Sequence, residues 1–302
     1  MKFLTIGVLL LVIFLGFFVW QGIYLPLDVN GQESLFSVEK GQNAFQIAEN
    51  LEREEMVKNS FFFSFYAVTS GNATKLKTGD YFLSPSLTVA NIVKKIASGD
   101  TATVTVTIPE GWTVAQIEER LGVELSSDLE GFLFPDTYNF SVNYSEKDVA
   151  EAMRENFERK LDSELHREIE KQGKTIHQIV TMASIIEKEV RTSQDKELVA
   201  GILWKRLEAG IPLQVDATIT YITGKRTTKV STEDTQIDSP YNTYRYRGLP
   251  AGPISNPGLE AILASVYPKS SEYWYYLSTP EGKTIFSITL PEHNEAKALH
   301  LK

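Results

Sequence analysis

The chain has 302 residues, of which 42% are apolar, so it is long enough to fold into two ordinary domains. Its formal net charge of -9 argues against sequence-independent binding to nucleic acid, which needs clustered Lys and Arg. The sequence has no cysteine and only four scattered histidines, which excludes disulfides and thiolate zinc sites and predicts neither a metal centre nor a cofactor.

The first predicted element is a membrane-spanning helix within residues 1–24. Phe3 to Trp20 carry no charge, and eighteen helical residues at about 1.5 Å each cross most of a bilayer core. The stretch ends in aromatic residues rather than at a small-residue cleavage site, which favours a retained anchor over a cleaved signal peptide. Lys2 precedes the helix, and the next basic residue is Lys40. We therefore expect a single-pass protein of the cell membrane with a cytoplasmic N-terminus and an extracytoplasmic body.

A small module follows the helix. Residues 25–34 contain turn-forming residues and are predicted to be a linker that lifts the body off the membrane. A weak internal repeat then places an extended segment or turn before a capped helix start, at 38–51, 87–92 and 108–121. The repeat predicts an α+β module over residues 35–100. This module loosely resembles the LysM-like domains that contact glycan chains, and the alternative is a generic module that positions the rest of the chain.

Residues 101–302 are predicted to form a larger α+β domain of catalytic size. Its expected elements are a strand at 101–108, helices beginning near residues 145 and 175, a helix at 196–208, and strands at 273–278 and 284–290. The segment 239–258 holds four prolines and three glycines, so we expect a long, irregular and functional loop there. The fold class of the whole chain is therefore α+β.

The helix that begins near residue 175 carries the first candidate for catalysis. Its apolar residues lie at spacings of three, four and seven and form one stripe: Ile176, Ile179, Val180, Ala183 and Val190. A helical wheel puts Glu187 in the middle of this stripe, whereas Glu189 points well away. Because burial disfavours a charged carboxylate, we expect Glu187 to hold a proton near neutral pH and to act as a general acid. The alternative is a buried glutamate that satisfies backbone groups or pairs with an arginine.

Serine hydrolase chemistry is not indicated. Ser184 and Lys188 are four residues apart rather than three, so the Ser-x-x-Lys pattern of acyl-transfer enzymes is not met. The sequence also lacks a G-x-S-x-G motif.

Residues 130–138 combine two carboxylates with three aromatic rings, a composition suited to the wall of a sugar-binding site.

Six motifs in a fixed order resemble the endolytic murein transglycosylase family, also called YceG-like or MltG-like proteins. They are EGFLFPDTY at 130–138, ASIIEKE at 183–189, LQVD at 213–216, SPYNTY at 239–244, GLPAGPISNPG at 248–258, and Glu292-His293-Asn294. Ala217, Ala251 and Thr284 depart from the family pattern, which bears on sugar subsites more than on activity.

The resemblance implies a catalytic glutamate at Glu187 and no metal or cofactor. It also implies substrate contacts at Glu130, Asp136, Tyr138, Gln214, Asp216, Tyr241, Asn242, Tyr244 and Asn256. The implied reaction is lytic cleavage of the β-1,4 bond between N-acetylmuramic acid and N-acetylglucosamine, with 1,6-anhydro ends, during strand termination in cell-wall synthesis. Penicillin-binding proteins are implied as partners. The alternatives are a hydrolytic muramidase with Asp216 or Glu130 as second carboxylate, and a non-catalytic peptidoglycan-binding scaffold.

Overall fold

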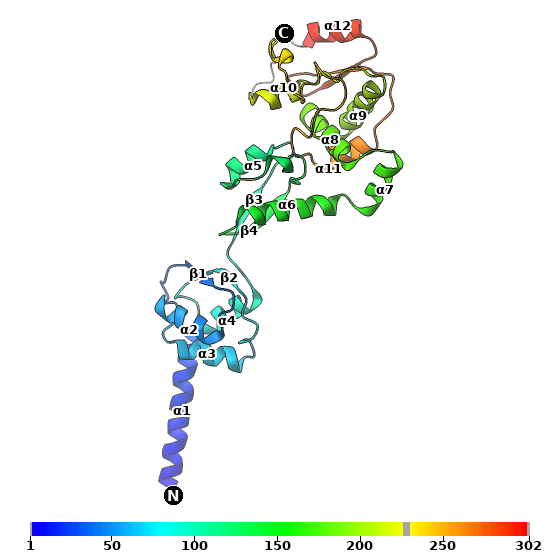
Figure 1. The fold of residues 1–302 in the computed structure, drawn as a ribbon. Helices are drawn as coiled ribbons and strands as arrows, with labels where there is room; N and C mark the ends of the chain where they lie inside the picture. Colours follow the sequence, from blue (N-terminus) through cyan, green and yellow to red (C-terminus); the bar gives the residue numbers. More distant parts are fainter. Residues whose placement is uncertain (1, 226–229, 301–302) are drawn as a thin grey trace. The chain divides into compact units, whose positions relative to one another are not determined.

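The computed structural model describes residues 2–225 and 230–300 and shows a mixed α+β protein. The chain folds as two compact units, each of which is described by itself below (Figure 1). The first unit comprises Met1–Thr105 and Asn139–Tyr144, and the second comprises Val106–Tyr138 and Ser145–Lys302. The strand pair β3 (Thr103–Thr107) and β4 (Thr137–Ser141) contributes residues to both units.

The first unit packs three helices against a two-stranded antiparallel sheet at the end of a long apolar helix. Its elements are α1 (Lys2–Tyr24), β1 (Ser34–Val38), α2 (Ala44–Arg53), α3 (Ser60–Thr69), β2 (Gly79–Leu83) and α4 (Val89–Ser98). Strands β1 and β2 are antiparallel, with Phe36 opposite Tyr81, and both of these side chains are fully buried in the core. Ile23, near the end of α1, joins the same core. The loop 25–33 therefore connects α1 to β1 without spacing the unit away from the end of the helix.

Helix α1 has the length and composition of a membrane span. The stretch Phe3–Tyr24 has a mean hydropathy of 2.7, and none of its most apolar window is buried inside the protein. This exposure distinguishes α1 from the core helix of a soluble protein and is compatible with a single-pass membrane anchor.

The predicted internal repeat corresponds to three strand–turn–helix steps. Each helix begins at a polar residue whose side chain accepts a backbone N–H: Asn43 before α2, Thr88 before α4, and Thr113 before α5 (Val114–Leu121). Gly41 and Gly111 occupy equivalent turns with φ of +92° and +75°, a backbone region that favours glycine. The repeat is thus a local folding unit that the chain uses in both of its compact parts.

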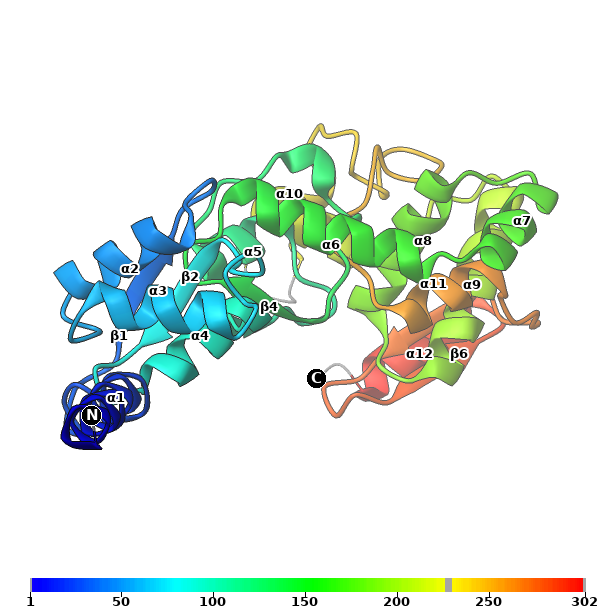
Figure 2. The same ribbon diagram turned by 90° about the horizontal axis from the view of Figure 1, so that it is seen from below.

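The second unit is built around a buried helix. Its elements after α5 and β4 are α6 (Glu146–Lys160), α7 (Ser163–Lys171), α8 (Ile176–Glu189), α9 (Ser193–Glu208), α10 (Asp216–Thr223), α11 (Leu259–Val266), β5 (Tyr275–Ser278), β6 (Thr284–Ser287) and α12 (Leu290–His300), with 3-10 turns at Ser127–Leu129 and Asp234–Gln236. Figures 1 and 2 both show α8, α9 and α11 side by side. Every residue of α8 from 179 to 186 is buried, so the apolar stripe on the wheel understates how deeply this helix lies.

Several predicted boundaries shift for identifiable reasons. Helix α9 begins three residues earlier than expected because the Thr192 side chain accepts the Asp195 N–H and caps it there. The last strand ends at Ser287 rather than at residue 290, because Leu290 begins α12. The segment 239–258 contains no helix and no strand, as expected, apart from a single bridge between Asn256 and Trp112.

Candidate active site

The carboxylate of Glu187 lies in the last turn of α8, where only 9% of the side chain is exposed. It accepts hydrogen bonds from Lys196 Nζ at 3.1 and 3.3 Å and from the backbone N–H of Gly258 at 3.1 Å. Gly258 precedes the first turn of α11, so the positive end of that helix dipole also faces the carboxylate. Three helices therefore meet at one acidic side chain.

The ion pair with Lys196 is a contact that the helical wheel did not predict. Glu187 is shielded from water as predicted, and a buried ammonium lies against its carboxyl group. The Lys196 side chain is only 3% exposed, and its Nζ also lies 3.8 Å from the carboxylate of Glu260. Lys196 belongs to α9, nine residues further along the chain and across a turn. A helical wheel drawn for α8 alone therefore does not show that Lys196 reaches Glu187.

Two further acids complete what we call the Glu187 cluster, defined as Glu110, Glu187, Lys196 and Glu260. Burial, and then the charge of Glu187, raise the pKa of Glu110. A Cβ atom added to Gly258 would lie 1.9 Å from Glu110 Oε1, so only glycine lets this carboxyl group reach its position. Glu110 is exposed and Glu260 is 57% exposed. Solvent therefore reaches the cluster on the side where these two acids lie.

No chemical pattern in the sequence singles out Glu110, which appears there only as part of the internal repeat. The signal that could have found it is the adjacent Gly111, which adopts a φ of +75°. A Cβ atom at Gly111 would lie 3.4 Å from Glu187 Cγ, so the turn passes directly beside the candidate acid. A sharp turn at an acid-glycine pair brings an acidic side chain to the end of α8.

Glu130, a predicted substrate contact, is part of a buried hydrogen-bond network. Both of its carboxyl oxygens accept the Val114 N–H at 3.2 Å, and Oε1 accepts Asn256 Nδ2 at the same distance. The Tyr221 hydroxyl donates to Oε2 at 3.5 Å. Burial raises the pKa of Glu130 to about 7, and the side chain is 8% exposed.

This pKa shift predicts how stability changes with pH. The folded protein binds the Glu130 proton more tightly than the unfolded chain, whose carboxyl group has an ordinary pKa of 4.5. The free energy of unfolding should therefore fall by about 3 kcal/mol through this group as pH rises from 4.5 to above 7. Glu130→Gln should lose this component of the slope, as measured by urea unfolding of the detergent-solubilised full chain between pH 4 and 8. An unchanged pH dependence in the variant would contradict the assignment.

Asn256 links this network to the Glu187 cluster. Its side chain accepts the Leu133 N–H at 2.9 Å and donates to the Trp112 carbonyl at 3.0 Å. Its backbone carbonyl accepts the Gly111 N–H at 2.8 Å. The Asn256 side chain is fully buried, so its observed task is to hold the Gly111 turn against the end of α8.

A second acidic cluster surrounds Glu189, on the other side of α8. Glu189 accepts hydrogen bonds from the Tyr276 hydroxyl and from the Ala217 backbone, and burial, followed by the charge of Asp216, raises its pKa to about 7. The Tyr244 hydroxyl donates a short hydrogen bond to Asp216. Two predicted substrate contacts, Asp216 and Tyr244, are thus brought together with a glutamate that the sequence left without a role.

Gln214 lies next to this second cluster. Its Oε1 accepts Arg206 Nη2 at 3.0 Å, and its backbone adopts a φ of +55°, an uncommon value for a residue other than glycine. The side chain nevertheless remains exposed. Strain of this kind often accompanies functional positions, which keeps Gln214 among the candidate substrate contacts.

The four remaining predicted contacts lie in two separate places. Asp136 and the hydroxyl of Tyr138 both accept Asn156 Nδ2 at 3.0 Å, and this set ties β4 to α6. In the loop 239–258, the Asn242 side chain is buried and donates to two backbone carbonyls, while the Tyr241 ring packs on Tyr221 at 5.1 Å. None of these four has a described contact with the Glu187 cluster, and their contact with substrate stays a prediction.

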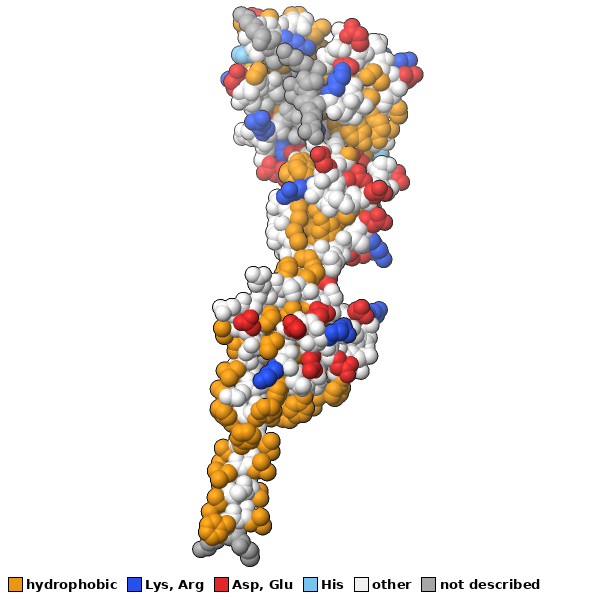
Figure 3. All heavy atoms as spheres, turned by 90° about the vertical axis from the view of Figure 1, so that its left-hand side faces the viewer, with side chains coloured by type: hydrophobic (Ala, Val, Ile, Leu, Met, Phe, Trp, Pro, Cys, Tyr) orange, Lys and Arg blue, Asp and Glu red, His pale blue; other side chains and the backbone are white. Residues whose placement is uncertain are grey.

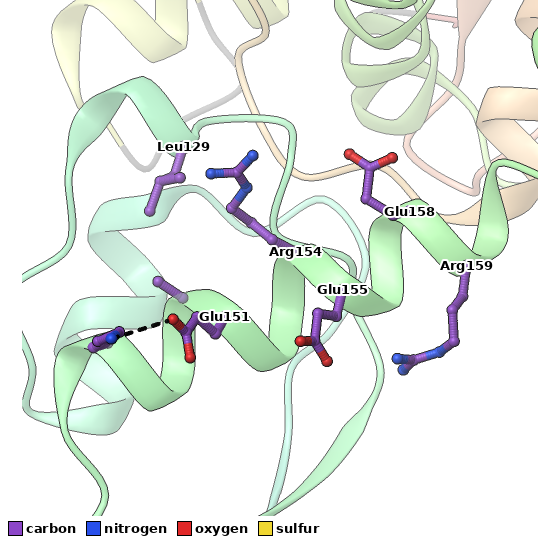
Figure 4. Close-up of a pocket in the computed structure, with 8 residues that line it drawn as sticks. Leu129, Glu151, Arg154, Glu155, Glu158 and Arg159 are labelled. Carbon is purple, nitrogen blue, oxygen red and sulfur yellow. Dashed lines mark ion pairs between the residues drawn. The ribbon is translucent and has the colours of Figure 1, made fainter.

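A shallow pocket lies along α6 (Figure 4). It is lined by Leu129, Lys147, Ala150, Glu151, Arg154, Glu155, Glu158 and Arg159. Charges of both signs alternate along this helix face, and Lys147 and Glu151 form an exposed ion pair at 3.6 Å. The pocket includes none of the predicted site residues and has the composition of a solvated helix surface.

Among residues 2–225 and 230–300, no group of three or more His, Asp and Glu side chains could hold a metal ion.

Residues 36–299 match the YceG-like family. The chain belongs to this family. A protein of Bacillus subtilis named endolytic murein transglycosylase is 28% identical, and the match covers 91% of this chain and 87% of that protein. A protein of the same name from Streptococcus pneumoniae is 29% identical, and there the match covers 95% of this chain but only 62% of the relative. The crystal structure of a YceG-like protein from Listeria monocytogenes, 32% identical, matches 89% of this chain and 100% of that one with a TM-score of 0.60.

Proposed function

We propose that the chain cleaves peptidoglycan glycan strands endolytically, with Glu187 as the catalytic acid. Family membership over residues 36–299, and relatives that carry the name over most of the chain, make this protein a lytic murein transglycosylase. The observation that supports Glu187 is its position: a carboxylate 9% exposed, held by Lys196 and Gly258, at the edge of an acidic cluster that opens to solvent.

The proposed reaction uses one carboxyl group twice. Protonated Glu187 gives its proton to the oxygen that leaves muramic acid C1 as the β-1,4 bond breaks. The resulting carboxylate then takes the proton of the muramic acid C6 hydroxyl while that oxygen bonds to C1. Atoms balance without water, the product carries a 1,6-anhydro end, and Glu187 regains its proton. A second carboxylate is therefore not required, in contrast to ordinary glycosidases.

Lys196 supports the step in which Glu187 becomes negatively charged. The ammonium stabilises the carboxylate that forms when the proton leaves, and it is already in place before the reaction. Before donating, Glu187 has to take up a proton, which weakens the ion pair. Glu260, whose carboxylate lies 3.8 Å from Lys196 Nζ, offers the ammonium a second partner in that state. Proton uptake then leaves no buried ammonium without an acceptor.

The remaining acids receive roles in binding the sugars. Glu110 borders Glu187 and is exposed, so it is suited to stabilise positive charge that develops at C1. Asp216, Gln214 and Tyr244 lie around Glu189 and are assigned to orient the sugar chain. Glu130 and Tyr138 are buried and already hydrogen-bonded, which favours indirect roles through the loops that they hold.

The cellular setting is part of the same proposal. Helix α1 anchors the chain in the cell membrane with the N-terminus in the cytoplasm and the catalytic body outside. The body would then act where nascent strands emerge, which fits strand termination during cell-wall synthesis beside penicillin-binding proteins. The LysM-like module, residues 35–100, would contact the glycan chain.

Mass spectrometry of the products tests this function. The full chain in detergent should convert purified glycan strands into fragments that end in 1,6-anhydro-muramic acid. Reducing ends would instead show a hydrolytic muramidase, which Glu110 beside Glu187 could support as second carboxylate. Sedimentation with insoluble peptidoglycan but no released fragments would show a non-catalytic scaffold.

A further inference from the structure

Helix α3 exposes an apolar stripe on the surface of the first unit. Its ten residues, SFFFSFYAVT, carry no charge. Phe61, Phe65 and Val68 are 55%, 41% and 56% exposed, and their spacing of four and three places them on one face. The rings of Phe61 and Phe65 stack at 5.7 Å. Clustered exposed aromatic side chains on an uncharged helix mark an interaction surface.

The adjoining face of α3 packs on the end of the membrane-spanning helix. The ring of Phe62 lies 5.6 Å from that of Phe18, and the ring of Tyr66 lies 6.1 Å from that of Tyr24. The contact is close, because a Cβ atom added at Gly22 would lie 2.4 Å from Phe62. Helix α3 is therefore fixed beside the last two turns of α1.

The length of α1 sets the level of this contact in a bilayer. The apolar stretch Phe3–Tyr24 has 22 residues, which at about 1.5 Å each match a hydrocarbon core of about 30 Å. Phe18 to Tyr24 then fall at the outer edge of the core, where Trp20 and Tyr24 supply the amphipathic rings typical of a membrane interface. Figure 3 shows apolar side chains gathered on this unit next to the point where α1 leaves it.

We propose that the stripe of Phe61, Phe65 and Val68 on α3 inserts into the outer interface of the lipid bilayer that α1 spans. The inference rests on α1 crossing a membrane, as proposed above. A lipid surface is the occupant because the stripe is continuous with a helix face that is itself lipid-exposed, and because α3 lacks the charged residues that would oppose burial in acyl chains. Helix α3 is too short to span the bilayer, so it lies in the interface and fixes the first unit against the membrane surface.

Fluorescence quenching by lipid tests this proposal. The chain has no cysteine, so single-cysteine variants of the full protein can each carry one environment-sensitive fluorophore. The probe variant is Phe65→Cys, and Val12→Cys in α1 reports whether the anchor itself enters the bilayer. The matched control is Phe82→Cys, another exposed Phe at 37%, on the β1–β2 sheet that Figure 1 places at the other end of this unit from α1. Each is reconstituted in phosphatidylcholine–phosphatidylglycerol vesicles with or without brominated acyl chains.

We expect brominated lipid to quench the fluorophore at positions 12 and 65 and not at position 82. Quenching at 12 without quenching at 65 would overturn this inference and leave the anchor in place. An absence of quenching at position 12 would overturn both this inference and the proposal that α1 spans the membrane. A label at 65 that is shielded from aqueous iodide but not quenched by lipid would show protein, such as a second copy, on the stripe and would also overturn the proposal.

Discussion

Replacement of Glu187 by Gln is expected to lower the rate of glycan cleavage by about 10²–10⁴-fold, the range that a general acid–base group contributes. Glutamine keeps the shape of the side chain but has no proton to give to the leaving oxygen. The measurement is the rate of fragment release from purified glycan strands by the full chain in detergent. A variant with the wild-type rate would show that another group supplies the proton.

Glu260→Gln is the matched control for this experiment. Glu260 also pairs with Lys196, but it is 57% exposed and does not accept the Gly258 N–H that holds Glu187 in place. It should therefore change the rate far less than Glu187→Gln. An equal loss in both variants would mean that the rate depends on the charge around Lys196 rather than on a proton from Glu187.

Replacement of Lys196 by Met should lower the free energy of unfolding by about 3–5 kcal/mol, because it leaves the carboxylate of Glu187 buried without its partner. The two side chains are 3% and 9% exposed, so solvation compensates little of the charge that the lost ammonium leaves behind. Urea unfolding of the detergent-solubilised full chain at neutral pH measures the change. Lys188→Met is the control, because Lys188 is exposed and its ammonium donates to the Gly111 carbonyl, at 3.2 Å, rather than to a buried carboxylate.

A double variant separates the structural and chemical roles of the pair. Glu187→Gln with Lys196→Met has no buried charge, so it should recover much of the stability lost by Lys196→Met. It should remain as slow in glycan cleavage as Glu187→Gln. A double variant no more stable than Lys196→Met would contradict the ion pair as the source of the loss.

The sequence could predict the elements whose signals are local. Helix α8 was expected from its apolar spacing and from Thr175, and the structure shows the complete capping box with Gln178 at its start. The burial of Glu187 followed from the same wheel. By contrast, α10 and α11 are eight residues each and have no side-chain cap at their starts, so no capping pattern marks where they begin.

Partners from distant segments could not be predicted in the same way. Lys196 and Gly258 reach Glu187 only because α9 and α11 pack on α8, and nothing in their local sequence encodes that crossing. The hydrogen-bond partners of Glu130 could not be predicted for a related reason. A carboxylate between aromatic residues suits a sugar site, but here it satisfies backbone and amide groups inside the fold.

The central claim is that Glu187, rather than its neighbour Glu189, supplies the proton. Burial raises the pKa of Glu189 to about 7, so it is the strongest rival acid on the same helix. The decisive measurement is fragment release from glycan strands by Glu187→Gln and Glu189→Gln side by side. Our account predicts that the first variant loses about 10²–10⁴-fold in rate and that the second stays within about tenfold of the wild type, since it loses an orienting group only. Cleavage by Glu187→Gln together with inactivity of Glu189→Gln would contradict it.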